Sequence, residues 1–191
     1  MDFVKLDQNY HDQLLKLEEE MYWYSGRWKE LWGKGAKQEF DNLIADYLTN
    51  FPGSCFGLAE RNELVGSMFL LKVSKLKPIP CIHKVPDYLD EKGDIAYVSL
   101  FVVKRGNNEV EIAEKLYEKA EEVALSIGCK KIAVVIFNSP LEEEVLKGNN
   151  YERSIEEYQW EIYPGLMVPC HIYTYSLLMD GSKVSGVNTF C

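Results

Sequence analysis

Residues 94–128 read DIAYVSLFVVKRGNNEVEIAEKLYEKAEEVALSIG, and this stretch decides the fold. Residues 94–103 are almost all β-branched, aromatic or aliphatic, which predicts a strand covered on both faces. After a polar turn, apolar residues recur at helical spacing, with acidic residues in the first turn and Gly128 at the position of a C-terminal stop. The stretch therefore predicts a buried central strand followed by a helix.

A second apolar strand is predicted at residues 131–137, directly after the helix. Because a helix connects the two strands, they are expected to run parallel in one sheet. Ser139, Pro140 and Glu142 then carry the pattern of a capped helix start. The same periodicities predict the remaining elements, which are strands at residues 3–6, 55–59, 64–71, 152–162 and 171–179, and helices from residue 10 and at residues 37–50.

The predicted helix starts with the segment Asn108-Glu-Val-Glu-Ile-Ala113, and Gly-Cys-Lys follows it at residues 128–130. With a Val-ending strand before it and an apolar strand after it, this layout resembles the GNAT acyl-CoA N-acyltransferase family over residues 54–162. Aligned on the helix, Ala113 matches the last small residue of the family's phosphate-binding loop, whereas Glu111 stands where the family has Gly. The resemblance implies an α/β fold with a central mixed sheet of six to seven strands and flanking helices, in which the two parallel strands splay apart.

The resemblance also implies an activity, the transfer of an acetyl group from acetyl-CoA to a primary amine of a small molecule or peptide. In the family, backbone amides of the central strand hold the pantetheine arm of the cofactor, which maps onto Phe101, Val102 and Val103. The other cofactor-binding positions that it implies are Asn108, Glu109, Val110, Glu111, Ile112, Ala113 and Asn138. The alternative is a GNAT-fold domain that has lost catalysis and binds CoA, another ligand or a protein partner. A structural protein without a ligand is the third and least favoured alternative.

Two carboxylates distinguish this loop from the family pattern. Glu109 and Glu111 lie in the first helical turn, where free N–H groups and the helix dipole otherwise bind phosphate. A carboxylate about 5 Å from a phosphate charge costs roughly 3 kcal/mol at an effective dielectric near 20, whereas one that faces water costs little. Lys104 and Arg105, just before the loop, either return positive charge to the site or are solvated turn residues.

Acyl transfer to an amine also needs a base for the amine and an acid for the leaving thiolate. Tyr97 and Ser99 alternate with Phe101 along the predicted central strand, so we expect all three on one face, and the first two are the candidate catalytic residues. A buried Tyr is more often structural, which is the alternative for Tyr97. In the helix after the second parallel strand, the family usually has a Tyr that donates a proton to the leaving thiolate. At this position the chain has Val145 or Leu146, and neither can donate a proton.

An aromatic cluster lies at residues 22–32, and three of its members, Tyr24, Trp28 and Trp32, are candidates for the wall of the amine-binding pocket. Aromatic faces attract cations by about 0.5–2 kcal/mol per contact, although core packing is the commoner role of such residues. A loop at residues 74–93 carries three prolines and a local group of basic residues. Loops of this length are usually functional or disordered, and its place in the resemblance is where the acceptor enters.

The composition limits the classes of partner. The 191 residues are enough for one domain, expected at residues 1–180, with a tail at residues 181–191. A net charge of −9 argues against nucleic acid as a partner. No apolar run is long enough to cross a membrane and the first residues do not resemble a signal peptide, so a cytoplasmic protein is expected. A homodimer is compatible with the sequence.

The five cysteines are expected to be free thiols, because their number is odd and no CxxC pair occurs. Two pairs of candidate metal ligands, Cys81 with His83 and Cys170 with His171, lack the spacing of a known zinc site. No metal is therefore expected.

Overall fold

The computed structural model describes residues 1–23, 35, 37–79, 85–106, 108–137, 139–163 and 165–177. Within these residues, eight strands form a mixed sheet in the order β1-β2-β3-β4-β5-β8-β6, with β7 paired to β8. Their bounds are β1 Asp2–Lys5, β2 Cys55–Glu60, β3 Glu63–Val73, β4 Ile95–Val103, β5 Lys131–Ile136, β6 Glu152–Arg153, β7 Tyr158–Tyr163 and β8 Leu166–Ser176. The sheet has more strands than the six to seven predicted because the segment at residues 152–162 divides into β6 and β7.

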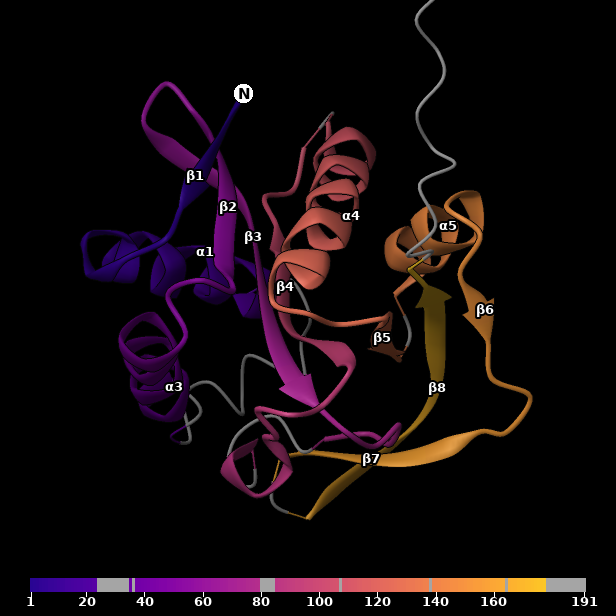
Figure 1. The fold of residues 1–191 in the computed structure, drawn as a ribbon. Helices are drawn as coiled ribbons and strands as arrows, with labels where there is room; N and C mark the ends of the chain where they lie inside the picture. Colours follow the sequence, from indigo (N-terminus) through magenta and orange to yellow (C-terminus); the bar gives the residue numbers. More distant parts are fainter. Residues whose placement is uncertain are drawn as a thin grey trace, which may run out of the picture.

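The helices lie on both faces of the sheet (Figure 1). α1 and α3 pack on one face, here called the α1 face, and α4 and α5 pack on the other, the α4 face. Each face has its own buried apolar cluster, as expected for a sheet covered on both sides. The bounds of the helices are α1 His11–Trp23, α3 Lys37–Asn50, α4 Glu109–Ser126 and α5 Pro140–Gly148, with short 3-10 turns η1 Gln8–Tyr10 and η3 Val85–Tyr88.

The parallel pair predicted from the sequence is confirmed. β4 and β5 pair in parallel from Ile95 and Lys131 to Val98 and Val134, and the pairing stops there. The rest of β4, from Ser99 onward, continues beside β3 alone. The two parallel strands therefore splay apart at the C-terminal half of β4.

A β-bulge in β4 changes which face its side chains occupy. The register between β3 and β4 shifts so that Phe69 pairs with Leu100 and Leu70 pairs with Val98, which leaves Ser99 as the extra residue. Tyr97 lies in the cluster of the α1 face, whereas Phe101 packs against the cluster of the α4 face. The predicted alternation of Tyr97, Ser99 and Phe101 along one face is therefore wrong, because the inserted residue reverses the two-residue period.

α4 is held against the sheet by a close approach and by a defined end. A Cβ added to Gly66 of β3 would lie 2.7 Å from Ile112 Cγ2, so only glycine admits α4 at this distance. At the other end, Gly128 has φ +79° and its N–H donates to the Leu125 carbonyl, as the predicted stop requires. The N–H of Cys129 reaches the Ala124 carbonyl at 2.9 Å, which completes a Schellman motif.

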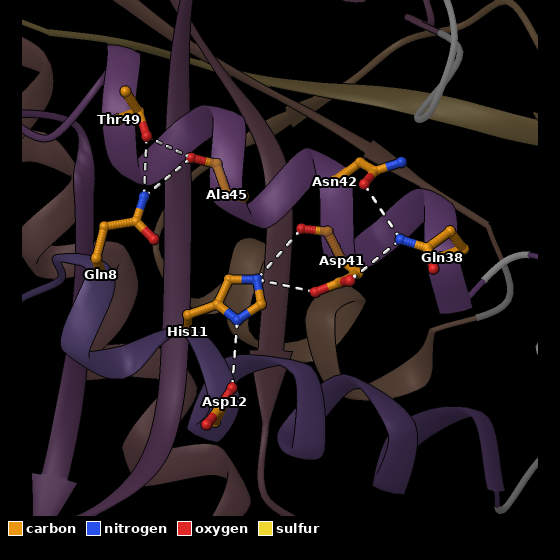
Figure 2. Close-up of polar contacts among 8 residues, drawn as sticks. All are labelled: Gln8, His11, Asp12, Gln38, Asp41, Asn42, Ala45 and Thr49. Carbon is orange, nitrogen blue, oxygen red and sulfur yellow. Dashed lines mark hydrogen bonds and ion pairs between the residues drawn. The ribbon is translucent and has the colours of Figure 1, made fainter.

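α1 and α3 pack side by side in opposite directions on the α1 face (Figure 2). Gln8 Nε2, just before α1, donates to the Ala45 carbonyl at 3.1 Å, while His11 Nε2 lies 3.0 Å from Asp41 Oδ1. Further along the helices, Lys37 Nζ pairs with Glu19 Oε2 at 3.1 Å. The C-terminal half of α1 therefore lies beside the start of α3.

Candidate active site

The splayed half of β4 presents backbone amides to the gap between β4 and β5. Lys104 N–H donates to the Val65 carbonyl of β3 at 2.8 Å. Because successive residues of a strand point their N–H groups to opposite sides, Val102 also points toward β3, whereas Phe101 and Val103 point toward the gap. Two of the three predicted pantetheine-binding positions therefore face the opening, and the third is part of the β3 ladder.

The predicted phosphate loop lies at the start of α4, and it contains a carboxylate of its own. Gly106 N–H donates to Glu109 Oε1 at 2.7 Å, so Glu109 turns back over the loop. The side chain of Asn108, the N-cap residue, makes no capping hydrogen bond, and the helix begins with Ile112 N–H bonded to the Asn108 carbonyl at 3.0 Å. An anion at this end of the helix would compete with Glu109 for the Gly106 N–H.

Glu111 is placed differently from Glu109. Its Oε1 lies 2.7 Å from Lys115 Nζ on the exposed side of α4, and this hydrogen bond and charge lower the pKa of the Glu111 carboxyl. Glu111 would repel a pyrophosphate only if its carboxylate faced the ligand. In the structure this carboxylate is instead paired with Lys115. Lys104 likewise pairs with Glu63 at 2.7 Å, so its ammonium group lies toward β3.

A cavity of about 290 Å³ opens between α1, the turn that joins β2 to β3, and the end of β4. It lies beside Lys104, at the same end of β4 as the start of α4. Charged groups of both signs line it, which suits a polar rather than an apolar molecule. Its lining residues are Gln13, Lys16, Leu17, Glu20, Arg61, Asn62, Glu63, Leu64 and Lys104.

The two predicted catalytic residues make structural hydrogen bonds. The Tyr97 hydroxyl accepts from Ile79 N–H at 3.3 Å, and Trp160 Nε1 donates to the Ile79 carbonyl at 2.8 Å. Together they hold Ile79 against the sheet, at the end of β4 opposite the start of α4. Ser99 Oγ donates to the Phe69 carbonyl at 3.3 Å and so ties down the bulge. A catalytic role for either residue remains a prediction.

An acid pair that sequence reasoning missed lies on the α4 face, with Tyr117 buried and Glu142 half-buried. The Tyr117 hydroxyl of α4 donates to Glu142 Oε1 of α5 at 3.1 Å, and the Tyr117 ring lies 5.3 Å from the ring of Phe101. Burial raises the pKa of Glu142 to about 7, although hydrogen bonds from Ser139 and Tyr117 oppose the rise. Burial and the neighbouring Glu142 raise the pKa of Tyr117 well above its usual value. The Glu142 carboxyl therefore takes up a proton more readily than an ordinary glutamate, next to the splayed half of β4.

The sequence predicts the helix that carries Glu142 but not its contact with Tyr117. Glu142 was expected at the helix start as the partner in a capping box, but the Ser139 side chain makes no capping bond. Only the packing of α5 against α4, which are separate in the sequence, brings the two side chains together. Val145 and Leu146, at the position of the family's usual acid, are buried apolar residues.

Four predicted site residues, Tyr24, Trp28, Trp32 and Asn138, lie outside the described residues. Among the residues that are described, no group of three or more His, Cys, Asp or Glu could hold a metal ion. Cys55, Cys129 and Cys170 are free thiols, and all three are buried. No helix in the described ranges is long and apolar enough to cross a membrane.

By sequence alone, no family model and no curated protein matches this chain. Its structure resembles solved structures of acetyltransferases and of a GNAT-like decarboxylase. A GNAT-like decarboxylase, GphF, in complex with isobutyryl-CoA aligns with a TM-score of 0.69 at 13% identity over 93% of this chain and 100% of its own. PaiA N-acetyltransferase from Thermoplasma acidophilum, in complex with coenzyme A, aligns with a TM-score of 0.62 at 14% identity over 92% and 98%.

An aminoglycoside 6'-N-acetyltransferase from Enterococcus faecium aligns with a TM-score of 0.60 at 14% identity, over 93% of this chain and 98% of its own. Each of the three alignments spans more than nine-tenths of this chain. The splayed parallel strands and the helix between them are the features that the sequence pattern predicted. The chain therefore has the fold of the GNAT superfamily over nearly its whole length.

Proposed function

We propose that this protein is an acyl-CoA-dependent N-acyltransferase that moves an acetyl group from acetyl-CoA to a primary amine of a small molecule or peptide. The observation that carries the proposal is the splay of β4 from β5, with the N–H groups of Phe101 and Val103 directed into the gap. Such amides can pair with the amides of a pantetheine arm as a neighbouring strand would. Structural neighbours with bound isobutyryl-CoA and coenzyme A support the choice of cofactor.

In this reaction the neutral amine nitrogen attacks the thioester carbonyl carbon. The C–N bond forms, the C–S bond breaks, and CoA leaves as a thiolate that must take up a proton. We assign that proton to Tyr117, whose ring contacts Phe101 on the splayed strand. Glu142, whose pKa burial raises to about 7, replaces the proton that the Tyr117 hydroxyl gives to sulfur. This pair would take the role of the Tyr that the chain lacks at Val145 or Leu146.

The second candidate function is a GNAT-fold domain that binds CoA or a protein partner without transferring an acyl group. The observation that favours it is the hydrogen bond from Gly106 to Glu109, which places a negative charge where a pyrophosphate would bind. In this case the splayed strands would keep their shape while the affinity for phosphate is reduced.

Calorimetric titration with acetyl-CoA, CoA and desulfo-CoA tests both candidates, followed by mass spectrometry of a panel of primary amines incubated with protein and acetyl-CoA. Binding together with an acetylated amine supports the enzyme. Binding of all three cofactors without any product supports the ligand-binding domain. Absence of binding to any of the three contradicts the proposed cofactor and with it the transferase.

A further inference from the structure

The cavity beside Lys104 takes no part in the proposed reaction. Its volume is about 290 Å³, close to the lower end of the roughly 300–1,000 Å³ of ligand pockets. Its innermost lining is apolar, because Leu17 of α1 and Leu64 of β3 are buried members of the cluster on the α1 face. The cavity therefore has room for a molecule of the size of a single amino acid, and not for one as large as CoA.

The two walls of this cavity are joined by a hydrogen bond. Leu64 N–H, at the start of β3, donates to Oε1 of Gln13 on α1 at 2.9 Å. The turn before Leu64 is tight, since Arg61 and Asn62 have φ values of +51° and +68°, as in the two-residue turn of a β-hairpin. The helix and the turn are thus held in place on either side, so the cavity is formed before any ligand binds.

Charges of opposite sign face one another around the opening. Lys104 Nζ lies 2.7 Å from Glu63 Oε1. The hydrogen bond and the charge of Lys104 lower the pKa of the Glu63 carboxyl, and the charge of Lys16 contributes. The same hydrogen bond raises the pKa of Lys104, and the charge of Glu20 contributes, although partial burial opposes the rise. Lys16 therefore lies toward Glu63. Glu20 lies toward Lys104.

Three charged side chains of the lining are available to a ligand. Lys16 and Glu20 lie one turn apart on α1, with about 5–6 Å between Cβ atoms at this spacing. Lys precedes Glu here, which is the less favourable order for an i,i+4 pair. Within the described part of the chain, no ion pair includes Lys16, Glu20 or Arg61. Two positive groups and one negative group thus line the same cavity without being paired.

We propose that this cavity binds a small zwitterionic amino acid, with its carboxylate against Lys16 and Arg61 and its ammonium group against Glu20. Arg matches the geometry of a carboxylate with two parallel hydrogen bonds, and an ammonium group has three donors for a carboxylate such as Glu20. Leu17 and Leu64 would contact the carbon chain between the two charges. A ligand with a single charge leaves part of the lining without a partner, so the site favours a zwitterion over a simple anion or cation.

The site is separate from the one proposed for acyl transfer. β4 leaves β5 after Val98, and Lys104 lies about 20 Å further along the strand at roughly 3.3 Å per residue. Lys104 N–H donates to the Val65 carbonyl, so this end of β4 is closed against β3. The cavity is on the α1 face, whereas α4 packs on the opposite face. The inference therefore stands whether or not the protein transfers an acetyl group.

Titration of the protein with 4-aminobutyrate, without CoA, tests the inference. Its four-carbon chain separates the two charges by about the spacing of Lys16 and Glu20. Butyrate lacks only the ammonium group and propylammonium lacks only the carboxylate. In ¹H–¹⁵N spectra we expect saturable shifts of the Asn62 and Leu64 amide signals, which assign binding to this cavity. Each of the two analogues should bind about fivefold or more weakly than 4-aminobutyrate, because it loses one charge pair.

Two substitutions separate the two ends of the ligand. Glu20→Gln should weaken 4-aminobutyrate binding about fivefold and leave butyrate unchanged, whereas Arg61→Gln should weaken both and leave propylammonium unchanged. Glu19→Gln is the matched control, because Glu19 pairs with Lys37 of α3 at 3.1 Å. It should alter none of the three affinities. All three positions are exposed or partly exposed, and melting temperatures check that the variants are folded.

Three results would overturn the inference. The first is that 4-aminobutyrate shifts neither amide signal. The second is that butyrate or propylammonium binds as tightly as 4-aminobutyrate, which would show a site for a simple anion or cation. The third is that Glu20→Gln and Glu19→Gln bind 4-aminobutyrate alike. Titration with CoA is a separate measurement, so failure of the proposed function and failure of this site are distinguished.

Discussion

Replacing Glu109 by Gln is predicted to tighten the binding of CoA. The Glu109 carboxylate lies 2.7 Å from the Gly106 nitrogen, at the mouth of the loop that would hold the pyrophosphate. Gln keeps the size of the side chain and an oxygen that can accept from Gly106, so the loop keeps its shape while the negative charge is removed.

The magnitude follows from the distance and the exposure. A phosphate bound at the same N–H groups would lie about 5 Å from the carboxylate, which corresponds to roughly 3 kcal/mol of repulsion at an effective dielectric of 20. Glu109 is partly exposed, and solvent screening reduces this to about 1–2 kcal/mol, or about tenfold in affinity. The gain should shrink as salt is added, because exposed charges are screened over roughly 10 Å at about 0.1 M.

Glu111→Gln is the matched control, two residues further along the same helical turn. Its carboxylate is paired with Lys115 at 2.7 Å on the exposed side of α4, so removal of its charge should change CoA affinity by less than about threefold. Isothermal titration of CoA into both variants at low and high salt measures the difference. The reasoning is refuted if Glu109→Gln binds CoA no tighter than the wild type, or if Glu111→Gln gains as much.

Three further outcomes are expected. Tyr117→Phe keeps the ring contact with Phe101 but lacks the hydroxyl, so kcat for acetyl transfer should fall by about tenfold to a hundredfold with the affinity for desulfo-CoA unchanged, and an unaltered kcat would exclude Tyr117 as the acid. Burial raises the pKa of Glu18 from its usual value of 4.5 to about 8, so the folded protein holds this proton more tightly and wild-type stability should fall as pH rises from 4.5 to 8. Urea unfolding should find Glu18→Gln without this fall and more stable by about 3–5 kcal/mol above pH 8. Gly66→Ala should destabilise the fold by about 1–3 kcal/mol, because its Cβ would meet Ile112 at 2.7 Å, and an unchanged urea midpoint would contradict so tight a contact.

Local patterns were enough to predict most elements of this chain. The apolar stripe at residues 37–50 coincides with α3, and Gly128 ends α4 in the left-handed conformation expected of a helix stop. The parallel arrangement of β4 and β5 followed from the helix between them, and it is present. These features depend on the spacing of hydrophobic residues, on helix capping and on chain connectivity. All three are properties of residues close in the chain, so they can be predicted from the sequence.

The faces of β4 and the partners of the charged residues were decided only in three dimensions. The bulge at Ser99 arises from pairing with β3, so sequence alternation could not show that Tyr97 and Phe101 lie on opposite faces. The sequence likewise predicted two carboxylates, Glu109 and Glu111, at the start of α4. It could not show that Glu109 is the one that turns back over the loop, because the direction of a side chain depends on its hydrogen-bond partner.

Packing also determined the environments of the Tyr117–Glu142 pair and of Glu18. Tyr117 meets Glu142 because α5 packs on α4, and Glu18 is buried because α1 packs across β3 and β4. In the sequence Glu18 is one of three consecutive glutamates and Glu142 is a helix-start residue, with nothing to mark Glu18 as buried or Glu142 as the partner of Tyr117. Sequence by itself determined the order and kind of the elements, which local interactions govern. Tertiary structure alone decided which carboxylates lose contact with water, because burial depends on residues that are distant in the chain.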